Sequence, residues 1–354
     1  MKDKIKVGIL FGGQSAEHEV SCRSAEFVYR SIDRERFEPF LIGIDKEGRY
    51  HYLKGHEDSL LNCTWTEYVE DDRVCFSQGD QAFFMETGGE KVFLDVAFPV
   101  LHGPNGEDGK LQGLFEFTGL PYVGCNTISS AICMDKDMTK KLMAAEGISQ
   151  VPYFCLYEED ENSDEDVATR ASDIGYPVFV KPCNMGSSVG VSKVEGEEEL
   201  FEAIAEAFKY DDKVLVEKGL DVLELEVAAF GKRNDFKLST VGAIRPNETF
   251  YDYETKYLTN DAEFDIPAPL SKKEEEELRG MAKKAFRAAM CYGLSRIDFL
   301  MDRKDKKIYF NEINTLPGFT AISLYPKLME FDGMGPMQLI SGLIDLALER
   351  GGRL

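Results

Sequence analysis

The chain has 354 residues, a mass of 39.9 kDa, a formal net charge of −23 and a sequence isoelectric point of about 4.7. Such a surface repels phosphate backbones and anionic lipids, which argues against a nucleic-acid-binding or membrane-surface protein. A hydrophobic content of 43% is typical of globular chains, and the length suits two or three domains. No apolar run approaches the ~20 residues of a membrane span and no signal peptide is evident, so we expect a cytoplasmic protein.

The eight cysteines and four histidines are scattered, and no C-x-x-C motif occurs. This pattern disfavours a disulfide framework and a thiolate zinc site. We expect most of the thiols to be small, buried side chains.

Strands alternate with helices over the first third of the chain. The predicted elements are a strand over 5–11, a glycine turn over 12–15, a helix over 16–32, strands over 40–44 and 92–101, a loop over 102–109 and a helix closed by Gly119. Because such alternation builds an open parallel sheet, we expect sites at the carboxyl ends of its strands. Residues 1–124 are predicted to form an N-terminal α/β substrate-binding domain.

Two further units are predicted, over 125–217 and 218–354. The elements expected in the first are a helix over 127–146, an acidic surface loop over 158–166, a short helix ending at Gly175, strands over 178–181 and 214–217, and a helix over 197–209. Those expected in the second are an aromatic loop over 250–269, a helix from the capping box Ser271–Glu274 to about Cys291, hairpin strands over 294–301 and 308–314, a Gly-Pro-rich loop and a helix over 339–348. The fold class is therefore α/β.

The hairpin carries the strongest chemical signal. If its turn is centred on Asp305, Asp298 faces Glu312 and Arg296 faces Asn314 on one side of the ribbon. Two carboxylates side by side repel each other and favour a bound cation, and Asp, Glu and Asn oxygens suit Mg²⁺. The alternative is a solvated polar face with a different register.

Two glycine-rich turns offer backbone N–H groups to anions. Lys181, at a strand end, precedes the turn Gly186–Gly190, which could hold a phosphate, although an ordinary hairpin turn explains these glycines equally well. The turn lacks the Walker spacing, but beside a Mg²⁺ hairpin it suggests ATP. Gly12–Ser15 precedes a helix N-terminus, and this turn is either an anion site or a plain strand-to-helix turn. Its spacing is not that of a dinucleotide-binding turn.

The stretch 250–265 is predicted to be a lid that ATP and substrate order. Unstructured segments of this length in compact domains often close over sites, and this one carries the run Tyr251–Tyr257. The alternative is a partly packed surface loop.

Taken together, these motifs resemble the D-alanine–D-alanine ligase family of the ATP-grasp superfamily. The matching stretches are FGGQSAEHEVS (11–21), LHGPNGEDGKLQG (101–113), MDKDMTKKLM (134–143), VKPCNMGSSVGVSKV (180–194), FYDYETKY (250–257), RIDFL (296–300) and NEINTLPGFT (311–320). They occur in the family's order and span essentially the whole chain. The resemblance implies a three-domain ATP-grasp fold with ATP between the central and C-terminal domains.

The resemblance also implies a role for individual residues. Glu17 matches the carboxylate that holds the ammonium of the first D-alanine, and Ser187 and Tyr257 match its hydrogen-bonded partners. The residues matching the nucleotide site are Lys136, Lys181 and Ser188 at the phosphates, Glu217 and Lys218 at the adenine, and Glu224 at the ribose. Those matching the metal ligands are Asp298, Glu312 and Asn314, for two Mg²⁺ ions that Mn²⁺ could replace. Arg296 and the Gly318 N–H match oxyanion donors. Lys256, Ser323 and Leu324 match the subsite for the second D-alanine's carboxylate, and His102 lines the same region.

Two departures bear on the second substrate. After Thr320 the chain reads Ala321–Ile322, where relatives often carry Ser and His. The N-terminal half is also similar to the vancomycin-resistance ligases, which add D-serine or D-lactate. Those relatives tend to carry Arg at the position of Leu324, and the lactate makers lack the Lys256–Tyr257 pair. We therefore predict D-alanyl-D-alanine formation for peptidoglycan precursor synthesis, with a D-alanyl-D-serine ligase as the alternative.

A function of another class is a nucleotide sensor on a decayed ATP-grasp fold. Decay should remove metal ligands first, and all three are present. The resemblance further implies D-alanine and ATP as the molecules bound, and a homodimer.

Overall fold

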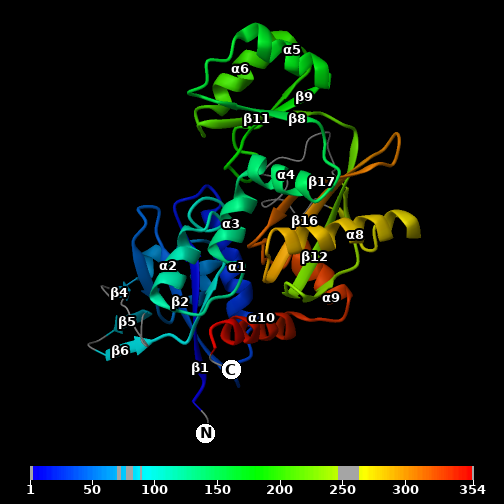
Figure 1. The fold of residues 1–354 in the computed structure, drawn as a ribbon. Helices are drawn as coiled ribbons and strands as arrows, with labels where there is room; N and C mark the ends of the chain where they lie inside the picture. Colours follow the sequence, from blue (N-terminus) through cyan, green and yellow to red (C-terminus); the bar gives the residue numbers. More distant parts are fainter. Residues whose placement is uncertain (1–2, 70–72, 77–82, 88–89, 246–262, 353–354) are drawn as a thin grey trace.

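The computed structural model describes residues 3–69, 73–76, 83–87, 90–245 and 263–352, and these contain three β-sheets with their own helices (Figure 1). This arrangement confirms the α/β class. Within the described ranges, no helix is both long and apolar enough to cross a membrane.

The N-terminal sheet has seven strands in the order β6-β5-β4-β3-β2-β1-β7. Its strands are β1 (Ile5–Gly12), β2 (Phe37–Ile44), β3 (Tyr50–Leu53), β4 (Arg73–Phe76), β5 (Phe83–Thr87), β6 (Glu90–Phe93) and β7 (Val96–Pro99). The helices of this unit are α1 (His18–Ser31), α2 (Lys110–Thr118), and the 3₁₀ helices η1 (Glu57–Leu60) and η2 (Trp65–Tyr68). The predicted parallel pairing holds for β2, β1 and β7, whereas β3 to β6 extend the sheet antiparallel.

Alternate side chains of β1 bury on opposite faces of this sheet. Val7 and Ile9 pack with α1, and Leu10 packs with α2. The single strand predicted over 92–101 is wrong, because β6 and β7 are separate strands with different partners. Between them the Asp95 carboxylate accepts a hydrogen bond from the Lys6 backbone N–H at 2.8 Å. The last two residues of β6, Val92 and Phe93, are apolar, as is all of β7, so the hydrophobic pattern continues across the change of partner.

The central sheet has four antiparallel strands in the order β10-β9-β11-β8, with two helices packed on it. Its elements are β8 (Tyr153–Tyr157), α5 (Asp164–Ile174), β9 (Val178–Pro182), β10 (Ser192–Val194), α6 (Glu197–Ala207) and β11 (Lys213–Lys218). The acidic stretch over 158–166 is surface-exposed, as expected, but its last three acids form the first turn of α5. Acidic side chains there complement the helix dipole.

The helix predicted over 127–146 is two helices, α3 (Thr127–Met134) and α4 (Lys136–Ala145). They meet at Asp135, whose backbone is extended and whose side chain accepts a hydrogen bond from the Met138 N–H. An Asp N-cap of this kind begins a new helix even though the apolar spacing continues. The two helices pack on α2, α8 and β17, and α4 also forms ion pairs with β11 of the central sheet.

The C-terminal sheet has the order β15-β14-β12-β16-β17, with β13 paired to β12. Its strands are β12 (Val222–Lys232), β13 (Asp235–Leu238), β14 (Gly242–Arg245), β15 (Glu263–Asp265), β16 (Gly293–Asp302) and β17 (Ile308–Asn314). Its helices are α8 (Lys272–Ala288), α9 (Leu324–Phe331) and α10 (Pro336–Arg350). The capping box at Ser271 and Glu274 is present.

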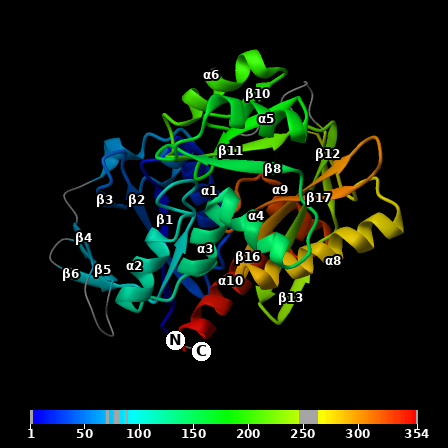
Figure 2. The same cartoon turned by 45° about the horizontal axis from the view of Figure 1, so that its top comes forward.

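The sequence did not predict α9, which occupies part of the expected Gly-Pro-rich loop. Its N-cap is Ser323, and Pro326 lies in its first turn, where a missing N–H costs no intrahelical bond. Helix α10 contacts α1 and β7 on one side and β12 and β16 on the other, as Figures 1 and 2 show. The division at 124 and 217 therefore remains an interpretation, since the last helix packs on both end units.

Candidate active site

Glu17 lies at the carboxyl end of β1, just before α1, and is 6% exposed. Its Oε1 accepts a hydrogen bond from the Ser187 Oγ of the central unit at 2.5 Å. Gly103 and Gly186 approach the same carboxylate so closely that an added Cβ would lie 2.7 and 3.2 Å from its Oε2. Ser187 adopts a φ of +50°, in the left-handed region. The enclosed carboxylate joins the N-terminal and central units and suits an ammonium ligand.

His102 is buried behind this carboxylate and is held in one orientation. Its Nδ1–H donates to the Leu316 carbonyl at 3.2 Å, and its Nε2 accepts from the Ser24 hydroxyl at 3.1 Å. Burial lowers the pKa of His102 to about 4, and the charge of Arg296 acts in the same direction. The ring is therefore neutral near pH 7 and serves to fix the loop rather than to carry charge.

Glu107 is a site residue that the sequence analysis missed. Its Oε2 accepts from the Gly103 N–H at 2.8 Å and its Oε1 from the Leu316 N–H at 3.4 Å, so it joins the N-terminal loop to the loop after β17. Burial raises the pKa of Glu107 to about 8, with the negative charges of Glu17 and Glu312 contributing. Its position in the predicted loop, five residues after His102, was the available signal.

Two lysines converge on Glu217, the fifth residue of β11. Lys181 on β9 bonds its Oε2 at 2.6 Å, and Lys140 on α4 bonds its Oε1 at 2.5 Å. Burial alone would raise the pKa of Glu217, but the two ammonium groups hold it at about 2. Lys140 was not predicted, although it lies one helical turn from Lys136, on the same face of α4.

Lys136 and Lys181 are both in the electrostatic field of Glu312, across the site. Burial lowers the pKa of Lys136, which donates to the Met185 carbonyl at 2.5 Å; Glu312 opposes that shift and Lys181 adds to it. Burial would also lower the pKa of Lys181, but Glu217 outweighs it and the pKa is raised. Two lysines opposite an acidic hairpin form a site suited to a polyanion.

The hairpin register is as predicted at the chemically important positions. Arg296 pairs with Asn314 and Asp298 with Glu312, and a bulge between Asp298 and Phe299 shifts the outer part by one residue. The Arg296 guanidinium donates to both Asp298 oxygens, at 2.8 and 2.7 Å. The Asn314 amide donates to Asp298 Oδ2 at 2.9 Å.

The donor set of the hairpin fits a hard divalent cation. Asp298 and Glu312 are directly opposite, Asn314 contacts Asp298, and all three carry oxygen ligands. Arg296 supplies positive charge at the Asp298 carboxylate. Its role as an oxyanion donor remains a prediction.

The loop after β17 brings Gly318 against Ser323, where a Cβ on Gly318 would lie 2.8 Å from the Ser323 Oγ. That hydroxyl also accepts from the Thr320 N–H at 3.1 Å. Leu324, the first residue of α9, is 4% exposed and belongs to the core cluster that includes Leu328. Its side chain therefore packs in the core, and its backbone N–H is the group available to a carboxylate.

The other predicted residues differ in how far the structure describes them. The negative charge of Glu224 on β12 helps to raise the pKa of Lys181, and Lys218 is the last residue of β11. Ser188 has a φ of +60° in the glycine turn. Lys256 and Tyr257, and most of the predicted lid over 250–265, lie outside the described residues.

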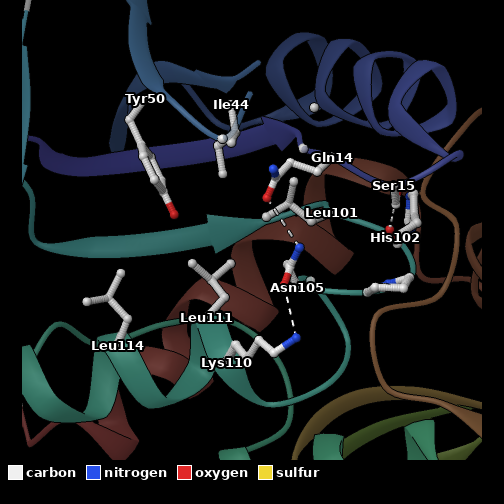
Figure 3. Close-up of a pocket in the computed structure, with 15 residues that line it drawn as sticks. Gln14, Ser15, Ile44, Tyr50, Leu101, His102, Asn105, Lys110, Leu111 and Leu114 are labelled. Atoms are coloured by element: carbon white, nitrogen blue, oxygen red, sulfur yellow. Dashed lines mark hydrogen bonds between the residues drawn. The ribbon is translucent and has the colours of Figure 1, made fainter. Parts of the chain in front are cut away.

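A cavity of about 220 Å³ lies beside the Gly12–Ser15 turn, against β1 and α2. Figure 3 shows Gln14, Asn105 and Lys110 in a row on one side and the apolar chains of Leu111 and Leu114 on α2. Ser15 lines this cavity, donates to the His102 carbonyl at 2.7 Å and accepts from the Glu17 N–H at 3.2 Å. The glycine turn thus borders both this cavity and Glu17.

The three sheets and the site between them define an ATP-grasp ligase fold. Comparisons identify the family: a model described as "D-ala D-ala ligase N-terminus" matches residues 6–125, and one described as "D-ala D-ala ligase C-terminus" matches residues 142–345. The chain belongs to the D-alanine–D-alanine ligase family.

Individual relatives cover nearly the whole chain. A D-alanine--D-alanine ligase of Caldicellulosiruptor bescii is 46% identical over 98% of this chain and 96% of its own length. Among solved structures, the VanG D-Ala:D-Ser ligase of Enterococcus faecalis matches with a TM-score of 0.87 and 36% identity over 98% of this chain and 100% of its own. The D-alanine-D-alanine ligase of Coxiella burnetii has a TM-score of 0.87 and 33% identity, covering 99% and 95%.

Proposed function

We propose that this protein joins two D-alanines into D-alanyl-D-alanine, with ATP converting the first to a D-alanyl phosphate. The observation that carries the proposal is the Ser187–Glu17 hydrogen bond of 2.5 Å. It sets a buried carboxylate, suited to a substrate ammonium, at the junction of two units. Glu17 acts electrostatically on Glu107, and Glu312 of the acidic hairpin acts on both Glu107 and Lys136 of the central unit.

The two sides of the site suit the two halves of the activation step. A carboxylate is a poor electrophile, so a phosphoryl group must first be placed on it. Lys136 and Lys181 would hold the phosphates of ATP, while Glu217, Lys218 and Glu224 would contact the nucleoside. Asp298, Glu312 and Asn314 would hold two Mg²⁺ ions, which neutralise phosphate charge when bound.

The second step is attack of an amine on the acyl phosphate. We assign the developing oxyanion to Arg296 and the Gly318 N–H, because preorganised donors lower the barrier where charge develops. The carboxylate of the second D-alanine would bind Lys256, the Ser323 hydroxyl and the Leu324 N–H. Tyr257 would complete the hydrogen-bond chain that begins at Glu17 and Ser187. Because an acyl phosphate hydrolyses, the segment over 250–265 would exclude water as a lid.

D-Alanine is the favoured second substrate over D-serine. The curated relatives of 42–46% identity are named as D-alanine ligases, whereas the VanG D-Ala:D-Ser ligase is 36% identical. The Leu324 side chain packs in the core, so it brings no polar partner to the second-substrate subsite. A D-serine hydroxyl buried without a partner would still cost about 1–3 kcal/mol, or roughly 5- to 150-fold in kcat/KM.

The test is a product assay with competing acceptors. Enzyme, ATP and Mg²⁺ are given D-alanine alone, then equal D-alanine and D-serine, then D-alanine and D-lactate. We expect ADP release that depends on D-alanine, and mainly D-alanyl-D-alanine in every mixture. ATP turnover without a dipeptide product would contradict ligation, and a mainly mixed dipeptide would establish the D-serine alternative. Nucleotide binding without D-alanine-dependent turnover would indicate the sensor.

The wider setting follows from the family and is part of the proposal. We infer that the product is a peptidoglycan precursor, that the protein acts in the cytoplasm as a homodimer, and that Mn²⁺ can replace Mg²⁺. Sedimentation equilibrium tests the dimer: a monomer mass at working concentrations would refute it. Activity with Mn²⁺ as the sole divalent ion tests the metal.

A further inference from the structure

Two cysteines from separate segments face each other near Glu17, the residue whose carboxylate is predicted to bind the first D-alanine. Cys22 lies on α1, one turn after His18, and Cys63 lies between η1 and η2. Their Sγ atoms are 2.7 Å apart. A disulfide needs about 2.05 Å, so a small movement would join them. Together with the His18 ring, they form a cluster whose three donor atoms all lie within 4.8 Å of one another.

His18 is oriented to act on Cys63. Its Nδ1–H donates to the Gly13 carbonyl at 2.6 Å, which leaves Nε2 for the sulfur. The hydrogen bonds from Cys22 and from His18 lower the pKa of Cys63 to about 5, although burial opposes this. Burial would lower the pKa of His18, but the hydrogen bonds with Cys63 and Gly13 and the charge of Cys63 together outweigh it and raise the pKa. The geometry is that of a thiolate stabilised by an imidazolium.

The two thiols differ in access. Cys22 is 0% exposed, whereas Cys63 is half-buried and so the more accessible of the two. The hydrogen bond to Cys63 and burial raise the pKa of Cys22. The accessible thiolate is therefore the group that attacks an oxidant, and the buried thiol is the one that resolves the product.

We propose that Cys22 and Cys63 are a redox-active pair that low-molecular-weight disulfides oxidise to an intramolecular disulfide. The Cys63 thiolate attacks one sulfur of the oxidant, forming a mixed disulfide and expelling one thiolate. The expelled thiolate takes the imidazolium proton of His18, and the neutral ring then accepts the Cys22 proton as Cys22 attacks the Cys63 sulfur and expels the second thiolate. Two electrons pass to the oxidant, and two thiols leave for the one disulfide consumed.

The pair is coupled to the candidate site by position. The new bond would link α1 to the segment over 57–68, and Glu17 directly precedes His18 on the chain. Trp65, the single tryptophan of the sequence, is fully buried, with its ring 6.1 Å from that of His18 and stacked on it. Trp65 fluorescence therefore reports on the pair without a label.

A second thiol pair supplies a matched control. Cys155 on β8 is half-buried and hydrogen-bonded to Cys183, which is 0% exposed. The hydrogen bond and burial raise the pKa of Cys155, and Asp137 adds to the shift. All four histidines of the chain precede residue 103, so this pair in the central sheet has none in its own unit. It should react slowly with the same oxidant.

The experiment exposes the full chain at neutral pH to glutathione disulfide, with a chelator present. Peptide mass spectrometry follows each thiol, and Trp65 emission is read in parallel. We expect a Cys22–Cys63 disulfide to form first, with Trp65 emission changing at the same rate. Cys22→Ser should trap glutathione on Cys63, and His18→Asn should slow the reaction about tenfold or more. Cys155→Ser should leave the Cys22–Cys63 reaction unchanged.

Three results would overturn the proposal. One is that Cys22 and Cys63 stay reduced while folded protein is confirmed by its thermal transition. The second is that Cys155–Cys183 forms at the same rate, which would remove the role of His18. The third result has two parts. Without chelator, the protein binds one Zn²⁺ per chain and Cys63→Ser does not; with chelator present, glutathione disulfide still fails to oxidise the pair. In that case the cluster is a metal site.

Discussion

The two sides of the candidate site shift the pKa of a buried glutamate in opposite directions. On the lysine side, which comprises Lys136, Lys140, Lys181 and Glu217, two ammonium groups hold the pKa of Glu217 at about 2. On the acid side, which comprises Glu17, Glu107, Asp298 and Glu312, burial and like charges raise the pKa of Glu107 to about 8. Near pH 7, Glu217 is therefore charged and Glu107 is neutral.

The contrast shows that partners, rather than burial, decide charge here. Glu217 is 2% exposed yet ionised, because each oxygen has its own lysine. Glu107 receives backbone N–H groups, and its nearest charges are other carboxylates. A protonated Glu107 adds no further negative charge beside Glu17 and Glu312.

The largest effect on activity should come from replacing Glu312, the acid-side residue that acts on the lysines. Glu312 lies opposite Asp298 and acts electrostatically on both Lys136 and Lys181. Glu312→Gln removes a predicted metal ligand and should lower kcat by about 10²-fold or more while the fold persists. Steady-state ADP release at saturating Mg²⁺ measures it. The exposed Glu330→Gln is the control. Near-normal turnover of Glu312→Gln would remove the metal assignment.

On the lysine side, the expected effect is on stability. Lys140→Met leaves Glu217 buried with one lysine, and breaking a buried pair from one partner costs about 3–5 kcal/mol. Lys141→Met, next along α4 and more than half exposed, should cost less than about 1 kcal/mol. Urea unfolding compares them. If the two variants are equally stable, the ion pairs around Glu217 do not stabilise the site. Adding Glu217→Gln to Lys140→Met should restore part of the unfolding free energy that Lys140→Met loses.

The pH dependence of stability should separate the two glutamates. Glu107 has its pKa raised from 4.5 to about 8, so the unfolded chain loses this proton first as pH rises. Glu107 therefore weakens stability progressively between pH 4.5 and 8, by a few kcal/mol in total, on the order of 1.4 kcal/mol per pKa unit. Glu217, with its pKa lowered to about 2, stabilises fully above pH 4.5 and loses this as pH falls towards 2.

Glu107→Gln should flatten the decline in Tm between pH 5 and pH 8, because glutamine has no proton to lose. Differential scanning fluorimetry across that range measures the slope. The exposed Glu38→Gln should keep the wild-type slope. An unchanged slope in Glu107→Gln would mean that Glu107 is ionised in the folded protein at neutral pH.

The hairpin of the acid side could be predicted from the sequence, because local patterns determine it. Strand alternation in the hairpin placed Asp298 opposite Glu312, and the bulge falls just beyond that pair. The capping box at Ser271 likewise depends on residues three apart. Such short-range rules need no knowledge of the rest of the chain.

What could not be predicted depends on distant partners. Lys140 and Lys141 are neighbours in one helix, and only the packing of α4 near β11 buries the first and leaves the second exposed. Glu107 owes its pKa to groups up to 209 residues away in sequence. The break at Asp135 and the change of partner at Asp95 are similar cases, since apolar spacing continues through both.

The smallest expected effect tests the contact between the two sides. Ser187→Ala removes the hydrogen bond to Glu17 Oε1. A hydrogen bond to a charged group contributes about 1.5–3 kcal/mol, and water can replace part of it, so we expect KM for the first D-alanine to rise about 5- to 30-fold. Because the serine acts on the carboxylate that binds the ammonium, kcat should change less than KM.

Ser188→Ala is the matched variant, since Ser188 shares the left-handed backbone of Ser187 but is predicted to face the nucleotide. It should raise KM for ATP and leave KM for the first D-alanine unchanged. Initial rates over a grid of both substrates separate the two constants. If both variants shift the same constant, the glycine turn acts as one unit, and the division between an amino-acid side and a nucleotide side of this loop is wrong. If only Ser187→Ala weakens D-alanine binding, Glu17 and Ser187 work as a pair across the junction.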